Sequence, residues 1–306
     1  MSNAPNSRDL LPPDAVAALR WATVDSGVIR GSALHAEVAK RMAARLPLFR
    51  DPPQVWLDWF PALGGGLAQP LTQSLWPKAQ CWIHEPSDSR RAKVLGRDQL
   101  PWFKRWFTPT PPVWRPGQAA PVDLLWSNLG LHAQHHPAEW LTAWREALRV
   151  NGALVFSVLG PDSFLELRDL YDQLAWPAPC QDWMDMHDWG DSLLKQGWVD
   201  PVMDMERLVF TYASAKDLIR DLRLWGRNLH PHRYPALRGR GWHRALLEAL
   251  EQRRLARPDQ RLRLTLEVIY GHALRGADRQ SLPATQSIPL DEVVKSIRNR
   301  SGGDVS

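Results

Sequence analysis

Cysteine is scarce in this 306-residue chain, which contains only Cys81 and Cys180. The two residues are far apart and form no CxxC pair, which excludes a disulfide framework and a cysteine-based zinc site. No stretch reaches the roughly 18 to 20 apolar residues that a membrane-spanning helix needs. The first residues, MSNAPNSRDLLPPD, lack the charged and apolar regions of a secretory signal. We therefore expect a cytoplasmic protein with no membrane contact.

Glycine and lysine are also scarce. The chain has 19 Gly against 26 Pro, and 7 Lys against 31 Arg, whereas glycine normally outnumbers proline. A chain with more rigid than flexible residues is poorly suited to glycine-rich ligand loops. The net charge of +5, the 44% hydrophobic content and the 23% charged content are ordinary for a globular domain, and 17 Trp add apolar bulk. A folded core is expected.

Strand and helix patterns alternate through most of the chain. Residues 1–50 have helical spacing of apolar side chains. Further on, the sequence predicts strands over 54–59, 79–85, 122–127, 153–159, 198–210 and 261–270, and helices over 67–75, 87–95, 138–149, 163–174, 188–195 and from about 214. This order predicts an α/β fold of the Rossmann-like, doubly wound type, with a mostly parallel sheet and N-terminal helices.

Three segments follow from this pattern. We predict an N-terminal helical segment over 1–50, an α/β domain over 51–275 and a mobile tail over 276–306, where periodicity is lost. Residues 98–121 interrupt the domain with six prolines interleaved with tryptophans, a density that forbids a regular helix or central strand. We expect a packed irregular connection there.

The first strand-loop-helix unit is the expected ligand site of such a sheet. Asp58 ends the first predicted strand, and Gly64, Gly65 and Gly66 follow six to eight residues later. Glu85 ends the second predicted strand, where an acid commonly accepts the two hydroxyls of an adenosine ribose. By itself this pattern is equally compatible with a flexible corner.

The stretch VDLLWSNLGLHAQHHPAEWLTAWREALRVNGALVFSVLGP resembles the region around strands four and five of class I S-adenosylmethionine-dependent methyltransferases. More narrowly, it is similar to the malonyl-acyl-carrier-protein O-methyltransferases of biotin synthesis, and the likeness covers roughly residues 25–275. The residues that fit that family's pattern are Asp123, Ser127, Asn128, Leu129, Arg149, Gly152, Ser157, Leu159 and Gly160.

The resemblance implies S-adenosyl-L-methionine as the cofactor and the carboxylate of a malonyl thioester as the methyl acceptor. The cofactor residues that it implies are Asp58, Gly64, Gly66, Glu85, Asn128 and Leu129. A cation is needed to orient the acceptor carboxylate, preferably a guanidinium. Our candidates for this acceptor site are Arg227, His187, Tyr212 and His132. The cluster of His132, His135 and His136 lacks a suitably spaced carboxylate, so no metal site is predicted.

The first loop departs from the family pattern L-D-x-G-x-G-x-G. Trp59, Phe60 and Pro61 follow Asp58, so the glycines come later, and a two-residue insertion would place Gly64 and Gly66 on the second and third family glycines. Apart from Asp98 at its start, the segment 98–121 also has no acid for the position that the family uses near the adenine. These departures keep a second hypothesis open, a pseudoenzyme or assembly factor that has the fold without the cofactor.

A basic segment lies between Arg220 and Arg263, with twelve Arg, no Lys and four acids. Such a face is suited to the acidic surface of an acyl carrier protein. The alternative of a nucleic-acid methyltransferase rests on the same segment, whose aromatic residues alternate with arginines. A solvated helix face in an arginine-rich protein explains the composition equally well.

Overall fold

The computed structural model describes residues 10–23, 32–48, 51–66, 68–85, 87–94, 96, 101, 111–115 and 120–277. The chain divides into two compact units, Met1–Gly276 and Ala277–Ser306, and the fold described below is that of the first. The tail predicted over 276–306 lies outside the described residues apart from Gly276 and Ala277. A boundary near residue 50 stays a prediction.

A six-stranded sheet forms the centre of the unit, with the order β2-β1-β3-β4-β6-β5. The first four of these strands are parallel, and β6 pairs antiparallel with both β4 and β5. The strands are β1 (Val55–Trp59), β2 (Gln80–His84), β3 (Val122–Ser127), β4 (Leu148–Leu159), β5 (Trp198–Tyr212) and β6 (Leu262–Arg275). The predicted mostly parallel, Rossmann-like α/β fold is confirmed.

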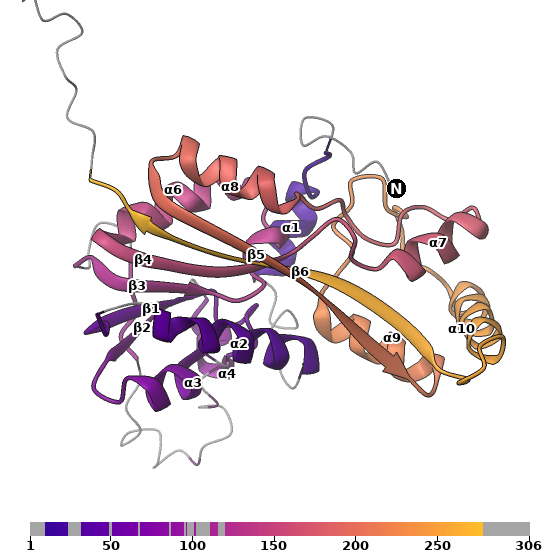
Figure 1. The fold of residues 1–306 in the computed structure, drawn as a ribbon. Helices are drawn as coiled ribbons and strands as arrows, with labels where there is room; N and C mark the ends of the chain where they lie inside the picture. Colours follow the sequence, from indigo (N-terminus) through magenta and orange to yellow (C-terminus); the bar gives the residue numbers. More distant parts are fainter. Residues whose placement is uncertain are drawn as a thin grey trace, which may run out of the picture. The chain divides into compact units, whose positions relative to one another are not determined.

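Helices connect the strands and cover both faces of the sheet. Figure 1 shows β5 and β6 running as a long pair from the sheet toward the end of the unit where α9 and α10 lie. The helices are α1 (Ala15–Thr23), α2 (Ala33–Arg45), α3 (Ala68–Leu75), α4 (Asp88–Val94), α6 (Pro137–Ala147), α7 (Leu165–Gln173), α8 (Met186–Lys195), α9 (Ala215–Trp225) and α10 (Arg240–Leu255), with short 3-10 turns η3 (Leu46–Leu48) and η5 (Leu131–Ala133). Among the described residues, no helix combines the length and apolar character needed to cross a membrane.

The core consists of two apolar clusters, one on each face of the sheet. Successive strand residues alternate between them: Leu124 and Trp126 pack with α2, whereas Leu125 packs with α6, as expected when side chains point to opposite faces with period two. Helix α2 fits this arrangement because Leu34, Val38 and Met42 recur at helical spacing.

The structure corrects the prediction in two places. The helix predicted over 138–149 ends at Ala147, and Leu148 already opens β4, where an irregular pairing at Asn151 and Gly152 restores the register with β3. Helix α10 was not predicted, because only Leu246 and Leu250 of its sixteen residues are buried and the arginines obscure the apolar stripe. Of the Pro-rich connection, residues 101, 111–115, 120 and 121 are described, and Val113 forms a parallel bridge to Ile83 at the outer edge of β2.

Candidate active site

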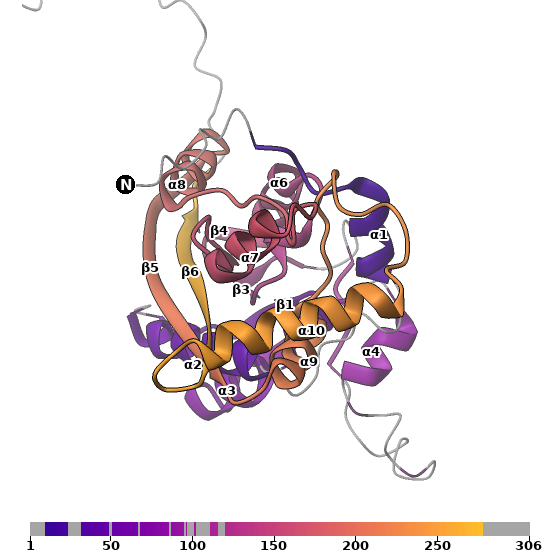
Figure 2. The same cartoon turned by 90° about the vertical axis from the view of Figure 1, so that its right-hand side faces the viewer.

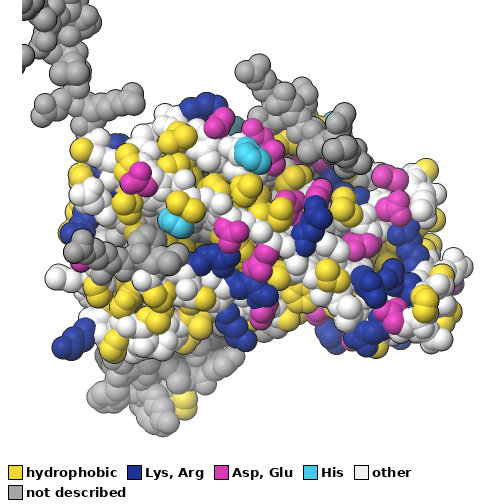
Figure 3. Space-filling view, in the orientation of Figure 1, with side chains coloured by type: hydrophobic (Ala, Val, Ile, Leu, Met, Phe, Trp, Pro, Cys, Tyr) yellow, Lys and Arg dark blue, Asp and Glu magenta, His cyan; other side chains and the backbone are white. Residues whose placement is uncertain are grey.

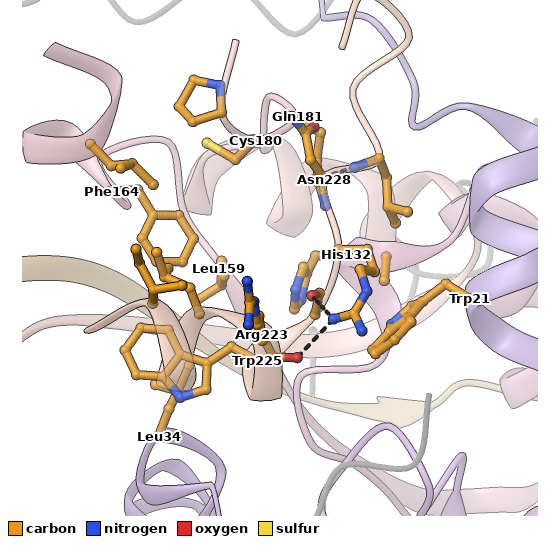
Figure 4. A pocket seen from close by; sticks show the side chains of 18 of the residues that line it. Trp21, Leu34, His132, Leu159, Phe164, Cys180, Gln181, Arg223, Trp225 and Asn228 are labelled. Carbon is orange, nitrogen blue, oxygen red and sulfur yellow. Dashed lines mark hydrogen bonds between the residues drawn. The ribbon is translucent and has the colours of Figure 1, made fainter. Parts of the chain in front are cut away.

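A cavity of about 550 Å³ opens at the carboxyl ends of the parallel strands. Leu63, Leu129 and Leu159, which follow or end β1, β3 and β4, form its floor, and the remaining wall comes from α1, α2, α7, α9 and α10 (Figure 4). This volume falls within the roughly 300 to 1,000 Å³ typical of small-molecule sites. Ligands of open α/β sheets bind at this edge, so the cavity is the candidate active site.

The cavity is cationic. Arg223, Arg227 and Arg238 line it, and none of the described residues in its wall is Asp or Glu. Nη1 of Arg227 donates to the carbonyl oxygens of Arg223 and Gly226, each at 2.8 Å, and its guanidinium lies 5.0 Å from the ring centre of Trp21. Burial and the neighbouring Arg223 lower the pKa of Arg227. Two guanidiniums held side by side without an acid favour an anionic ligand.

Two histidines line the same cavity and are neutral near pH 7. Burial lowers the pKa of His132 to about 4, and burial together with His132 lowers the pKa of His35 to about 3. The Nδ1 atom of His35 lies 2.8 Å from the Ser32 hydroxyl, whereas Nδ1 of His132 is buried without a hydrogen-bond partner among the described residues. His132 is therefore a hydrogen-bonding group for a ligand and adds no charge. No metal-binding group of three His, Cys, Asp or Glu exists in the described part of the chain.

Arg238 is held by aromatic rings. Its guanidinium carbon lies 4.3 Å from the ring centre of Trp242, 5.2 Å from that of Tyr234 and 5.4 Å from that of Tyr171. Cation–π contacts fix a charge in place without neutralising it. Arg238 is thus a positioned cation in the cavity wall.

The geometry of the first loop bears on the two-residue insertion considered for the family glycines. The three glycines of the family pattern would fall two, four and six residues after Asp58, on Phe60, Ala62 and Gly64. Phe60 has a φ of 55°, the left-handed conformation that favours glycine, and a Cβ on Gly64 would lie 3.1 Å from the carbonyl oxygen of Asn128. The loop geometry therefore favours the register without insertion, and Gly66 lies instead against Val94.

Phe60 does not crowd the cavity. Its ring lies 5.0 Å from that of Trp140, 5.5 Å from that of His84 and 6.0 Å from that of Trp59, and none of these residues lines the cavity. The aromatic side chains of this loop are buried in the core instead.

Asn128 connects the loop to its surroundings. Its Nδ2 donates to the carbonyl oxygens of Gly64 at 3.0 Å and His35 at 3.1 Å, and its Oδ1 accepts from Ser157 Oγ at 3.0 Å. The Ser157 hydroxyl in turn accepts from the Leu129 N–H at 3.0 Å. Gly64, Asn128 and Leu129, which the sequence singles out separately, thus form one hydrogen-bonded unit that joins β1, α2, β3 and β4.

Asp58 and Glu85 come together at the ends of β1 and β2, and both are buried. Burial, and then Glu85, raise the pKa of Asp58 to about 8. Burial also raises the pKa of Glu85, against the opposing effect of Arg90, whose Nε lies 3.2 Å from Glu85 Oε1. Neither carboxylate lines the cavity.

The structure brings three of the predicted residues to the cavity: Leu129, His132 and Arg227. His187 does not reach it, because its side chain is 84% exposed on α8 beside Asp185. Tyr212 is also outside it, buried at the end of β5 opposite Leu262, where burial and Asp221 raise its pKa. These two residues stay predictions without support from the cavity.

Sequence reasoning missed Arg223 and Trp21. Arg223 precedes Arg227 by four residues, a spacing that places two residues on one helix face when the helix continues, and this signal was available in the sequence. No sequence signal identified Trp21, because its contact with Arg227 depends on α1 lying beside the end of α9.

Comparison with known proteins gives the family. No family model matches the chain. It is 37% identical to the malonyl-[acyl-carrier protein] O-methyltransferase of Laribacter hongkongensis, over 82% of this chain and 85% of that protein. It is 32% identical to the protein of the same name from a Methylovorus species, with the same coverage.

Solved structures bear on the fold alone. The YcgJ protein of Bacillus subtilis matches with a TM-score of 0.52 at 10% identity, over 79% of this chain and 99% of that one. The sequence relatives carry the assignment: this chain belongs to the malonyl-[acyl-carrier protein] O-methyltransferase family.

Proposed function

We propose that the protein methylates the free carboxylate of a malonyl group carried as a thioester on an acyl carrier protein, in biotin synthesis. One observation carries the proposal: in a chain of this family, the cavity at the carboxyl edge of the sheet is lined by three arginines and no acid among the described residues. A carboxylate is the ligand that such a wall favours.

S-adenosyl-L-methionine, when bound, supplies a methyl group on a positively charged sulfur. The two acidic side chains at the ends of β1 and β2 fit its ribose, because a ribose offers two hydroxyl donors. Both side chains are buried and need hydrogen-bond donors, and no described residue gives Asp58 one. Glu85 and Asp58 would hold the nucleoside hydroxyls, and the unit of Gly64, Asn128 and Leu129 would support the loop beside them.

Arg227 and Arg223 would hold the acceptor carboxylate. An ionised carboxylate is already a nucleophile at pH 7 and requires no general base, so the task of the protein is to fix one oxygen in attacking geometry. His132, neutral at that pH, offers its ring nitrogen to the second oxygen or to the thioester carbonyl. The apolar floor of Leu63, Leu129 and Leu159 excludes water from the reacting groups.

The proposal is tested by supplying S-adenosylmethionine and malonyl-acyl carrier protein, and identifying the methyl ester by mass spectrometry. Arg227→Ala should lower kcat/KM by about 30- to 150-fold, the effect of about 2 to 3 kcal/mol for a lost hydrogen-bonded charge pair. Arg220→Ala is the matched control, because Arg220 is exposed on α9, seven residues before Arg227, and pairs with Asp217 outside the cavity.

Three results would contradict the proposal or part of it. Wild-type protein that forms no ester would remove the reaction itself. Equal methylation of acetyl- and malonyl-acyl carrier protein would show that the carboxylate is not the acceptor, and equal losses in Arg227→Ala and Arg220→Ala would remove Arg227 from the site.

A further inference from the structure

The twelve arginines between Arg220 and Arg263 fall into two groups. Six form ion pairs, and Arg261 donates hydrogen bonds to Thr211. The other five form no ion pair with the described residues, although one of them, Arg227, donates to two backbone carbonyl oxygens. The seven engaged residues are Arg220, Arg233, Arg253, Arg254, Arg257 and Arg263, each with an acid, and Arg261 with Thr211. The five others are Arg223, Arg227, Arg238, Arg240 and Arg244.

Most of the engaged arginines lie away from the cavity, toward the end of α10 and the start of β6. Arg253 pairs with Asp169, Arg254 with Glu251, and Arg263 with Asp259. In Figure 3, dark blue and magenta side chains lie next to each other over this right-hand end of the molecule. Their charges are largely balanced within the chain, so this part of the segment offers little attraction to an anionic partner.

The unengaged arginines concentrate at the cavity. Arg223, Arg227 and Arg238 line it, and Arg240 and Arg244 are exposed on the first two turns of α10, whose Trp242, His243 and Leu246 line it. Figure 2 shows α10 crossing this end of the molecule below α7, with its first turn toward α1. Glu248 follows Arg244 by one helical turn without forming an ion pair with it, and the first turn of α10 contains no acid.

An apolar residue completes this surface. Leu237 lines the cavity and is 99% exposed, the highest exposure among the large hydrophobic side chains of the described residues. We call Leu237, Arg238, Arg240 and Arg244 the mouth patch. It combines positive charge that has no ion-pair partner among the described residues with one exposed apolar side chain, and its members line the cavity or lie on the helix that does.

We propose that the mouth patch is the docking surface for the acidic acyl carrier protein, while Arg223 and Arg227 inside the cavity receive the malonyl carboxylate. This inference rests on the proposed function. Of the twelve arginines in the basic segment, it assigns contact with the carrier protein to the three of the mouth patch. Charge complementarity favours this partner, since an acidic protein is attracted by cations that form no ion pair within the chain. Leu237 would meet an apolar side chain of the carrier.

The test compares two double variants with the same change in net charge. Arg240→Glu with Arg244→Glu reverses two of the three positive charges of the patch. Lys78→Glu with Lys195→Glu makes the same change in net charge at exposed lysines on the α3–β2 turn and at the end of α8. Binding of fluorescently labelled holo-acyl carrier protein is measured at low and high salt. The patch variant should bind about tenfold or more weakly at low salt, the control variant within about twofold of wild type, and the difference should shrink as salt rises.

A kinetic measurement separates docking from chemistry. With malonyl-pantetheine, which lacks the carrier, the patch variant should keep the kcat and KM of wild type, whereas its KM for malonyl-acyl carrier protein should rise. Equal weakening by both double variants, equal KM changes for both substrates, or tighter binding of a single-stranded oligonucleotide than of the carrier would each overturn the inference. Failure of wild type to methylate either substrate would remove the proposed function instead, and the binding experiment would still decide the docking surface.

Discussion

The two ends of the carboxyl edge of the sheet hold ionisable side chains of opposite type in opposite environments. At β1 and β2, Asp58 and Glu85 are buried with a single fully buried cation, Arg90. Across the sheet, at the cavity, Arg223 and Arg227 are exposed and have no acid among the described residues. One end is acidic and closed, and the other is basic and open.

The difference lies in how each charge is stabilised. A buried carboxylate loses several kcal/mol of hydration and stays ionised only with a close partner, so the acidic end depends on Arg90 or on donors from a ligand. An exposed guanidinium keeps its water and needs no partner. The basic end is therefore available to bind an anion, as the proposed carboxylate acceptor requires. The carboxyl groups of the acidic end, in contrast, already depend on Arg90 in the absence of a ligand.

Breaking the acidic end should have the largest effect. Arg90→Ala leaves the Glu85 carboxylate without its cation and removes the donor to the carbonyl oxygens of Trp21, at 3.0 Å, and Ala22. We expect the free energy of unfolding to fall by about 3 to 5 kcal/mol, as for other broken buried pairs. Urea denaturation at neutral pH measures it.

The neighbouring residue provides the control. Arg91 pairs with the exposed Asp88, and Arg91→Ala should lower the free energy of unfolding by at most about 1 kcal/mol. Equal losses in the two variants would mean that burial does not distinguish the two ion pairs.

The pH dependence of stability should separate the acidic end from the rest of the protein. The pKa of Asp58 is near 3.8 in the unfolded chain and about 8 in the folded one. Between these values the folded state keeps a proton that the unfolded state has lost, so stability falls as pH rises, by about 1.4 kcal/mol per pH unit. Asp58→Asn removes this contribution. The free energy of unfolding of the variant, relative to wild type, should therefore rise by roughly that amount for each pH unit between pH 5 and 7.

Thermal or urea unfolding across that pH range checks the difference. Asp51→Asn, which changes an exposed carboxylate just before β1, should instead give a curve parallel to wild type. A parallel curve for Asp58→Asn would show that Asp58 is ionised at neutral pH in the folded protein.

The fold was predictable because its strands obey short-range rules. Strand β3 and residues 152–159 of β4 are buried, and their apolar character is visible in the sequence. The caps Ser32, Asp185 and Ser214 mark the starts of α2, α8 and α9. Helix α10 was not predicted because most of its residues are exposed to solvent, so the spacing of its apolar residues gave no clear helical pattern.

The site was predictable only in part. Gly64, Asn128 and Leu129 were identified from the sequence, but their mutual hydrogen bonds depend on the packing of four elements. Phe60 was interpreted as displacing the glycines, because the sequence does not show its left-handed backbone or the position of its ring beside Trp140. Which arginines of the basic segment are neutralised depends on long-range partners such as Asp14 for Arg233 and Asp169 for Arg253.

The smallest effect is expected for Glu85, and it tests whether the acidic end binds the nucleoside. Glu85→Gln keeps the shape of the side chain and removes its charge, so hydroxyl donors of a bound nucleoside would lose a charged acceptor. We expect the affinity for S-adenosylhomocysteine to weaken by about 1 to 3 kcal/mol in calorimetry, with Asp88→Asn, exposed one turn away, unchanged. Because Glu85→Gln also leaves Arg90 without its carboxylate, stability should fall in the same variant. A loss of stability with unaltered affinity would mean that Glu85 serves only to neutralise Arg90, and that the nucleoside hydroxyls are held elsewhere.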